Sequence, residues 1–586
     1  GVWKITVGSS LPTAEDGQVT IDATTQPGYD GSRPVVIVLR DSSSTIDLKL
    51  GVTQYDDHNL VRGLALQGVG IMLNGDDNII SHNWLGLTDD GADIYYYNDN
   101  PDNRNNAIIE GAGGSGHNYL HHNVLAGSGT VAVDLEGNDN LIEENYIGTR
   151  GDGTIDTSFP EANICDPTVA TDNWLGGGGI NIAGYRNRVL NNTLVGLLIK
   201  GSATSTPPDA IDVGFGEYSL IQGNRIGVDA TGAEVWTCGD GVSDVGSDFT
   251  RILSNTIVNS FGNGIYIDGN YWDSNANTVQ GNVISNCIAA YTFGDTIPDE
   301  LALFSPALVT LIDGANVTGI SDDPCPYCYV DLYLDDNDPW TEALAYLGRA
   351  QADVNGDWSF TLPRALTENE GLRTISTIRN YGVIDKYEIG SSSKLSILFE
   401  ERPAAGITSV EIITPTGELW TDMDYYFVAN VAPVEATLPI TYVWEATDLV
   451  SQTVRGGVEK AVTFNWDTPG SKTVHVTAYG YGGSSAEASV DVEVVGRVPL
   501  MGVAIDGPSE GYAGVSYTFD ALPIPTDATT PITYTWMPDP ASGQGSAQAT
   551  YQWSMTGTHS ITVTAENYAG LFTDTHTIEI GDAPSC

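Results

Sequence analysis

The chain has 586 residues, too many for one hydrophobic core, so several domains are expected. It carries 76 acidic against 23 basic residues, a formal net charge of -53, which disfavours binding to nucleic acid or to anionic membranes. No apolar run is long enough for a membrane-spanning helix, and 67 glycines with only 17% charged residues are typical of a turn-rich all-β protein.

The first half of the chain repeats a short phrase. It consists of a polar residue, usually asparagine, an aliphatic residue two positions later, an asparagine three positions after that, and a second aliphatic residue, as in Asn78-Ile80-Asn83-Leu85. The phrase alternates with period 2 and is bounded by turn-forming residues, which indicates a short strand. Its second asparagine is present in all seven copies: Asn83, Asn123, Asn145, Asn192, Asn224, Asn255 and Asn282.

The copies keep their internal spacing while the connections between them vary, which is the signature of a solenoid. A second phrase, apolar-x-apolar followed by glycine, accompanies most copies, as in Val133-Asp134-Leu135 before Gly137. Two or three short strands per coil predict a parallel β-helix of about ten coils, roughly 50 Å long. Stacked coils would place the recurring asparagines in a hydrogen-bonded ladder, so we interpret them as structural.

Two stretches resemble a large bacterial family of secreted right-handed parallel β-helix repeat proteins. Residues 19–29 read VTIDATTQPGY and residues 224–232 read NRIGVDATG, close to phrases of that family. The resemblance implies a right-handed β-helix over residues 1–300 and export to the cell surface or medium. The family has no single activity, so the resemblance carries the fold and not a reaction. A chain that begins at Gly1 rather than methionine suggests N-terminal processing after export.

Two insertions interrupt the solenoid, at about residues 88–107 and 150–177. The first contains Tyr95, Tyr96 and Tyr97, which suit either carbohydrate stacking or a protein contact; the alternative is a loop folded back over its own coil. The second contains Cys165, which we expect to pair with Cys238 in an exported protein. Cys287 and Cys586 receive no assigned partner.

Beyond residue 300 the repeat stops and the strands alternate as in antiparallel β-sandwiches. Residues 301–402 resemble the Ig-like module that often follows such solenoids. In it, Cys325 and Cys328 precede an alternating strand rather than a helix, so a structural disulfide is expected and a redox site is not. Asp335, Asp336 and Asp338 follow that strand and form either a Ca²⁺ site or an ordinary acidic turn.

Residues 403–497 and 498–586 repeat each other. The motif Pro439-Ile440-Thr441-Tyr442-Val443-Trp444 recurs as Pro531-Ile532-Thr533-Tyr534-Thr535-Trp536. Both stretches resemble PKD-like Ig-fold modules of bacterial surface proteins. The mid-strand tryptophans Trp444 and Trp536 are interpreted as core residues.

No catalytic residue is assigned. The outward positions of the second phrase form a candidate ligand face with Asp134, Asn181, Asp212 and Tyr266, to which the tyrosines of the first insertion are added. Glycosidases need two carboxylates about 5 to 9.5 Å apart. Asp134 and Asp212 are two copies apart, which at one strand spacing per coil is about 10 Å, at or beyond that range.

The sequence therefore favours an extracellular structural protein: a self-assembling cell-surface, matrix or filament subunit. Strand-like residues 2–7 at the start of the solenoid predict head-to-tail contacts, in which an Ig-like module or strand of one copy meets the solenoid of the next. The alternative is a carbohydrate-active β-helix enzyme or a glycan-binding adhesin with Ig-like spacers. No cofactor is required by the sequence except the candidate Ca²⁺.

Overall fold

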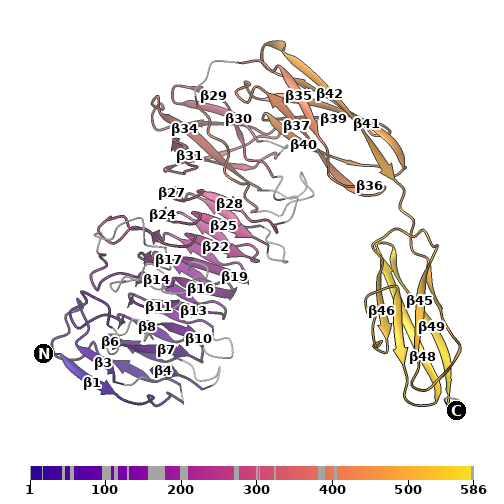
Figure 1. The fold of residues 1–586 in the computed structure, drawn as a ribbon. Coiled ribbons are helices and arrows are strands. Elements are labelled where there is room, and N and C mark those ends of the chain that lie inside the picture. The colour runs from indigo at the N-terminus through magenta and orange to yellow at the C-terminus, as the bar shows by residue number, and fades with distance from the viewer. Residues whose placement is uncertain are drawn as a thin grey trace.

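The computed structural model describes residues 2–15, 17–41, 46–52, 58–95, 107–110, 116–128, 131–155, 178–197, 209–269, 276–297, 301, 304–321, 325–379, 390–400 and 405–582. Figure 1 shows a solenoid of stacked strands, indigo to magenta, followed by three β-sandwich modules that end in yellow. Strands dominate the described residues, and the one short 3-10 turn among them is η3 (Tyr481–Gly483). The predicted all-β architecture, a parallel solenoid followed by Ig-like sandwiches, is confirmed.

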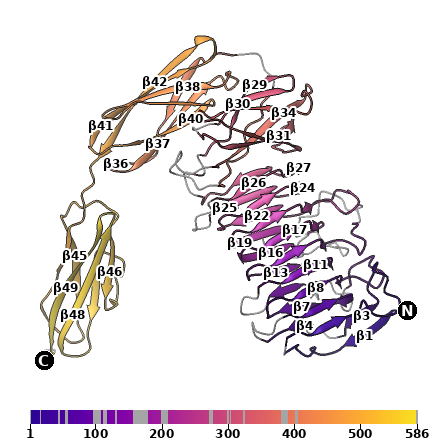
Figure 2. The same ribbon diagram turned by 180° about the vertical axis from the view of Figure 1, so that it is seen from behind.

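The solenoid consists of three parallel sheets, here called A, B and C, whose strands stack coil upon coil (Figure 2). Each coil contributes its strands in the order C, A, B. Sheet A contains β1 (Trp3–Val7), β3 (Val36–Arg40), β6 (Leu64–Gln67), β9 (Trp84–Leu85), β12 (Val124–Leu125), β15 (Tyr146–Ile147), β18 (Thr193–Leu194), β21 (Arg225–Ile226), β24 (Thr256–Val258) and β27 (Val283–Ser285). Sheet B contains β4 (Ile46–Leu50), β7 (Val69–Leu73), β10 (Ile108–Glu110), β13 (Val133–Leu135), β16 (Ile180–Tyr185), β19 (Ile211–Glu217), β22 (Val242–Val245), β25 (Ile265–Asp268) and β28 (Tyr291–Phe293). Sheet C contains β2 (Thr20–Asp22), β5 (Leu60–Arg62), β8 (Ile79–Ser81), β11 (Tyr119–His121), β14 (Leu141–Glu143), β17 (Arg188–Leu190), β20 (Leu220–Gln222), β23 (Arg251–Leu253) and β26 (Thr278–Gln280).

The core of the solenoid is a stack of aliphatic columns, because the strand register places like residues above one another. In sheet C the central residue of each strand points inward, so that Ile80, Leu120 and Ile142 are stacked and fully buried. In sheet B the apolar residues of the second phrase form equivalent columns. Burial of these side chains, at about 25 cal/mol per Å² of apolar surface, is the main favourable term for the fold.

Two polar ladders run along the corners that flank sheet C. In the ladder at its end, each Oδ1 accepts hydrogen bonds from the backbone N and the Nδ2 of the corresponding asparagine one coil earlier, over the whole run from Asn83 to Asn282. The ladder at the start of sheet C begins at Asn59 and continues through Asn78, Asn118, Asn140 and Asn187. These amides satisfy backbone groups that the corners would otherwise leave unpaired in the interior.

The first Ig-like module closes the last coil of the solenoid. Ile284 of β27 and Ala343 exchange two backbone hydrogen bonds of 2.9 Å, and the Tyr333 hydroxyl accepts the Gly281 N–H at 2.8 Å. The module supplies buried side chains to the same core as the coils: Tyr333, Ala343, Ile375 and Leu395. Residues 390–392 add hydrogen bonds to residues 276–279. The solenoid and this module therefore share one continuous core.

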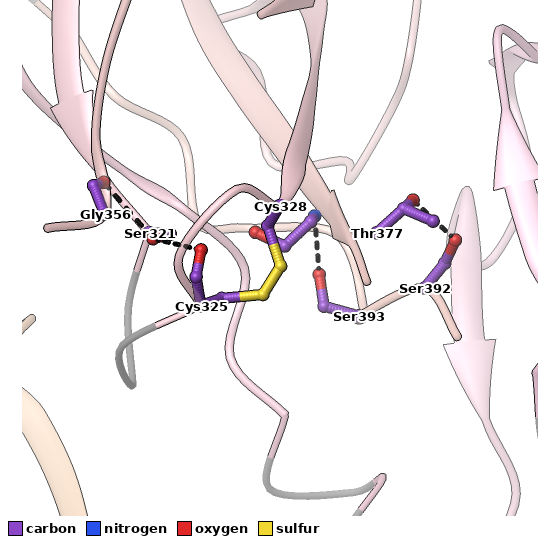
Figure 3. Close-up of a disulfide and its surroundings, with 8 residues drawn as sticks. Ser321, Cys325, Cys328, Gly356, Thr377, Ser392 and Ser393 are labelled. Atoms are coloured by element: carbon purple, nitrogen blue, oxygen red, sulfur yellow. Dashed lines mark hydrogen bonds between the residues drawn. A yellow bond between two sulfur atoms is a disulfide. The ribbon is translucent and has the colours of Figure 1, made fainter. Parts of the chain in front are cut away.

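That module is a small sandwich. Its strands are β29 (Leu308–Asp313), β30 (Asn316–Ile320), β31 (Tyr329–Asp336), β32 (Ala345–Gln351), β33 (Asp357–Thr361) and β34 (Glu370–Thr377). Cys325 and Cys328 form the disulfide expected from the sequence, immediately before β31 (Figure 3). Ser321 Oγ donates to the Cys325 carbonyl at 3.0 Å, and Ser393 Oγ accepts the Ser376 N–H at 2.9 Å, so this loop and residues 392–393 both anchor to the sandwich (Figure 3).

The two remaining modules repeat one another, as the sequence indicates. The first contains β35 (Ser409–Ile413), β36 (Leu419–Trp420), β37 (Asp424–Ala432), β38 (Ile440–Ala446), β39 (Gln452–Gly456), β40 (Glu459–Asn465), β41 (Gly470–Tyr479) and β42 (Ser485–Val495). The second contains β43 (Gly502–Asp506), β44 (Glu510–Tyr512), β45 (Ser516–Ile524), β46 (Thr533–Met537), β47 (Gln548–Gln552), β48 (Gly557–Asn567) and β49 (Gly570–Gly581). Trp444 and Trp536 are fully buried in the two separate cores, which agrees with their interpretation as core residues.

Candidate functional site

The outward row of sheet B holds most of the side chains predicted as a ligand face. Asp134 lies opposite Asn181, and Asn181 opposite Asp212, in three successive coils. Asn181 Nδ2 donates to Asp134 Oδ1 at 2.8 Å. The row continues through Ser243 to Tyr266. The coil of Ser243 was missed in the sequence because its inward position holds an aspartate, which breaks the apolar-x-apolar phrase.

Two further aspartates, which the sequence pattern did not identify, lie beside this row. Asp209 Oδ1 accepts the Asp240 N–H at 2.7 Å, and Asp240 Oδ1 accepts the Asn263 N–H at 2.5 Å. Burial, together with the nearby charges of Asp240 and Asp212, raises the pKa of Asp209 to about 7. Burial also raises the pKa values of Asp212 and Asp240. Near neutral pH Asp209 therefore populates both its protonated and its ionised form, as a general acid or base does.

The aspartate that breaks the phrase is Asp244, which points into the solenoid core. It is stacked between Val213 and Ile267 and is fully buried. Ser247 lies close enough to oppose the rise in its pKa, but neither carboxyl oxygen makes a hydrogen bond of normal geometry among the described residues. Burial raises its pKa well above the ordinary 3.8. The hydroxyl of Tyr291 is also buried without a hydrogen-bond partner among the described residues, and burial, together with the nearby carboxyl group of Asp244, raises the pKa of Tyr291. We interpret Asp244 as a neutral carboxylic acid at neutral pH, since an isolated buried charge is far more costly.

A groove lies on the other side of the solenoid, over the corner between sheets C and A. It has a volume of about 450 Å³, within the range of small-ligand sites. The loop at residues 29–34 forms one wall, and the corners of four successive coils form the other. Its aromatic and ionisable lining residues are Tyr29, Arg33, His82, Trp84, His122, Glu144 and Tyr146.

A cluster of three histidines borders this groove. His122 Nε2 lies 2.9 Å from Glu144 Oε2, and His122 Nδ1 lies 2.9 Å from His121 Nδ1. His82 stacks on His122 with ring centroids 5.0 Å apart. Burial is the largest cause that lowers the pKa of His82 and of His121, the latter to about 4, so both rings are neutral at neutral pH. The sequence analysis did not identify this cluster, although four histidines directly precede a ladder asparagine: His58, His82, His117 and His122.

The acidic cluster predicted to bind Ca²⁺ lies at the junction between the solenoid and the first Ig-like module. Donor oxygens of Asp335, Asp336 and Glu342 lie within 4.8 Å of one another, the only such group of three or more His, Cys, Asp or Glu residues in the described part of the chain. Asp338 is not part of it, because Asp338 is exposed and its Oδ1 accepts the Trp340 N–H at 2.8 Å. Glu342, which the sequence did not indicate, takes that place in the cluster.

The surroundings of the cluster bear on whether a cation fits. Buried Asp335 is paired with Arg373, which supplies one positive charge already. Glu342 Oε1 accepts the Asn286 N–H of the solenoid at 2.7 Å, and Asp336 Oδ1 is buried without a hydrogen-bond partner among the described residues. Burial raises the pKa values of Asp335 and Glu342. An all-oxygen donor set with an unsatisfied carboxylate oxygen fits a hard cation such as Ca²⁺, and it would link the module to the solenoid.

The remaining predicted site residues are the tyrosines of the first insertion and the two cysteines predicted to pair. Tyr95 lies on the sheet A side, with its N–H bonded to the Gly86 carbonyl and its hydroxyl to the Arg40 carbonyl, so it is not next to Asp134. Tyr96, Tyr97 and Cys165 lie outside the described residues. Cys238 is disulfide-bonded, and Cys287 is a buried free thiol whose pKa burial raises to about 12.

Comparison with known proteins identifies one module. Residues 503–580 match the PKD domain family. No curated protein matches the chain.

Solved structures resemble parts of it at low identity. A 1.5-MDa bacterial ice-binding adhesin is 11% identical over 46% of this chain and 91% of that one, with a TM-score of 0.20. A Ca²⁺-stabilised adhesin with which an Antarctic bacterium binds ice is 12% identical over 46% of this chain and 69% of that one, also with a TM-score of 0.20. Domains FN1–FN3 of chicken CNTN1 are 9% identical over 47% of this chain and 99% of that one, with a TM-score of 0.19. At such TM-scores the likenesses carry no argument about function.

Within the described ranges, none of the helical segments has the length and hydropathy that crossing a bilayer requires.

Proposed function

We propose that this chain is an extracellular structural protein that acts as a rigid, cell-surface or matrix rod and presents its solenoid at a distance from its C-terminal modules. The observation that carries the proposal is the shared core between the last coil and the first Ig-like module, in which Tyr333 bonds to Gly281 and Ala343 pairs with Ile284. A junction with backbone pairing and a common core resists bending, whereas flexible linkers are the default between domains.

The environment we propose is outside the cell. The Cys325–Cys328 disulfide and the disulfide-bonded Cys238 are of the kind that persist in oxidising compartments. The PKD match supports the same placement, because the sequence resemblance ties PKD-like modules to bacterial surface proteins. The high negative charge keeps such a protein soluble and limits non-specific association.

We extend the proposal to self-assembly through the first strand of sheet A. The outer edge of β1 is not paired with another strand within the described residues, and Trp3 and Ile5 are 57% and 52% exposed. An open strand edge accepts a further strand, supplied either by sequence outside these 586 residues or by a second copy of the chain. Light scattering of the purified chain should show concentration-dependent growth that Ile5→Lys abolishes, and monomers at every concentration would exclude the second copy.

We also propose that Ca²⁺ binds at the junction through Asp336 and Glu342, with Asp335 shared with Arg373. The support is the buried, unpartnered Asp336 Oδ1 beside two more carboxylates. Bound Ca²⁺ would stiffen the rod where the solenoid meets the first module.

A second candidate function is the cleavage of a glycan. It is favoured by the raised pKa of Asp209, about 7, beside Asp212 on the outward face of sheet B. The test incubates the chain with neutral and acidic polysaccharides and assays new reducing ends and unsaturated products. The structural proposal predicts no turnover. Turnover that Asp209→Asn abolishes would overturn it and establish the second candidate.

A further inference from the structure

The three histidines beside the groove are held in place by the ladder. His82 and His122 are in the left-handed backbone conformation, at φ 56° and 55°, and each directly precedes a ladder asparagine. The parallel register sets Ser81 opposite His121, and the His82 N–H donates to the His121 carbonyl at 3.3 Å. The backbone therefore stacks the three imidazoles at one corner, and the positions of their Cβ atoms do not depend on the loops.

The spacing of the rings matches that of ligands on one metal ion. Their centroids form a nearly equilateral triangle with sides of 5.0 Å for His82–His122, 5.2 Å for His121–His122 and 5.5 Å for His82–His121. Three imidazoles bound to a tetrahedral Zn²⁺ at about 2.0 Å place their ring centroids roughly 5 Å apart. Two donor atoms already face each other, because the Nδ1 atoms of His121 and His122 are 2.9 Å apart. The ring nitrogens of all three histidines do not yet lie within 4.8 Å of one another, so His82 would have to rotate its ring to turn a nitrogen toward the same point.

The groups that contact the imidazole rings are also typical of a metal site. Ligating histidines commonly donate their other ring N–H to a carboxylate, which fixes the tautomer. His122 has this arrangement: its Nε2 lies 2.9 Å from Glu144 Oε2, which leaves a lone pair on Nδ1. Tyr119 stacks on His121 with a centroid distance of 4.2 Å and bonds through its hydroxyl to Glu143, so the His121 ring is supported on one face.

We propose that His82, His121 and His122 form a binding site for a transition-metal ion of the Zn²⁺ class, with Glu144 as the group that orients His122. The site is separate from the oxygen-donor cluster of Asp335 and does not depend on the proposed structural function. Since His82 and His122 also line the groove, the fourth coordination position would be open to a ligand from solution.

The chain offers matched controls for the test. His58 and His117 occupy the same kind of position, with φ 64° and 57° before Asn59 and Asn118, but their partners are Asp77 and Asp139 on the other ladder. Asparagine tolerates this backbone conformation, so His→Asn substitutions should preserve the fold at all four positions. Far-UV circular dichroism and the melting temperature verify this for each variant.

Isothermal titration of the metal-stripped full chain with Zn²⁺, in millimolar Ca²⁺ to fill oxygen-donor sites, measures the affinity. We expect one saturable site, at least about 100-fold weaker in the double variant His82→Asn/His122→Asn and about 10-fold weaker in Glu144→Gln. The double variant His58→Asn/His117→Asn should bind as the parent does. Electron paramagnetic resonance with Cu²⁺ should show coupling to imidazole nitrogens, and lose it in the first double variant only. Absence of saturable binding, or equal losses in both double variants, would overturn the proposal.

Discussion

The ladder asparagines are predicted to hold the solenoid together, and Asn145 gives the sharpest test. Its Oδ1 accepts hydrogen bonds from Asn123 N at 2.9 Å and Asn123 Nδ2 at 3.0 Å. Its Nδ2 shares its two hydrogens among the Leu120 carbonyl, the Glu143 carbonyl and Asn192 Oδ1, each at 3.0 Å. In Asn145→Ala all five contacts are lost at a position that is buried in the parent.

The loss can be estimated bond by bond. The Asn123 backbone N–H becomes a buried donor without a partner, at a cost of about 1–3 kcal/mol. Asn123 Nδ2 keeps its bond to the Ile80 carbonyl, and Asn192 Oδ1 keeps the Asn145 N–H, so these lose only one bond each. With about 1 kcal/mol for the Asn123 Nδ2 bond and about 1 kcal/mol for each of the two Asn145 Nδ2 hydrogens, the total destabilisation is about 4–6 kcal/mol.

Urea unfolding followed by far-UV circular dichroism measures this loss, with Asn181→Ala as the matched control. Asn181 points outward from sheet B and is half-buried, and among the described residues its side chain makes one hydrogen bond, to Asp134. The control should cost about 1 kcal/mol or less. If Asn145→Ala costs no more than Asn181→Ala, the reasoning that the ladder satisfies buried backbone groups is wrong.

Three further predictions follow from the same structure. Asp244→Val should raise the free energy of unfolding at pH 7, because burial raises the pKa of Asp244 in the folded state. The folded protein keeps a proton that the unfolded chain releases above the ordinary pKa of 3.8. In the parent, the free energy of unfolding therefore falls as the pH rises from about 4 toward the folded-state pKa of Asp244. The pH dependence of the melting temperature should flatten in this variant, and an unchanged profile would show that Asp244 does not titrate between the two states. Tyr333→Phe should cost about 1–3 kcal/mol by leaving the Gly281 N–H buried and unpaired, as measured by calorimetry, whereas a neutral effect would mean that water reaches the junction. Millimolar Ca²⁺ should raise the melting temperature relative to EDTA in the parent and in Asp338→Asn but not in Asp336→Asn/Glu342→Gln; the same response in all three would place the ion elsewhere.

The repeating parts of the fold could be predicted from the sequence because each coil has to pair the same backbone groups at its corners. The second asparagine of the phrase recurs for that reason, and the strand fixes its spacing from the first. The coil before Asn83 was not recognised in the sequence, because Leu64 stands at the position of the second asparagine of the phrase. Its first asparagine, Asn59, is nevertheless the first member of the ladder at the start of sheet C. Ser243 and Asp244 escaped notice because a polar residue at the inward position hides the apolar period.

Side chains brought together by loops could not be predicted. Asp209 follows a connection of variable length, and its position beside Asp240 depends on how that connection returns to sheet B. Glu342 joins Asp335 and Asp336 only because residues 341–343 pair with the last coil. The closure of the solenoid by the first Ig-like module was likewise not foreseen, since the sequence indicates a separate sandwich and does not reveal that it contributes Tyr333 to the neighbouring core.

The histidine cluster lies between these cases. Its backbone positions repeat with the ladder and were visible in the sequence as histidines directly before Asn83 and Asn123. The third ring, His121, comes from the end of β11, and Glu144 occupies the corner one coil later. In the sequence, the cluster is visible only as histidines that occupy the same position in the phrase. This becomes informative when successive coils are aligned, because the aligned histidines then lie next to one another.

We propose that the solenoid and the first Ig-like module form one rigid rod. Electron microscopy of single full-length chains, with particles aligned on the solenoid, tests it most directly. We expect the first module to occupy the same position in every class, because a shared core and backbone pairing hold it. A first module that takes a broad range of positions relative to the last coil would show that the junction is a flexible linker and not part of a rigid rod.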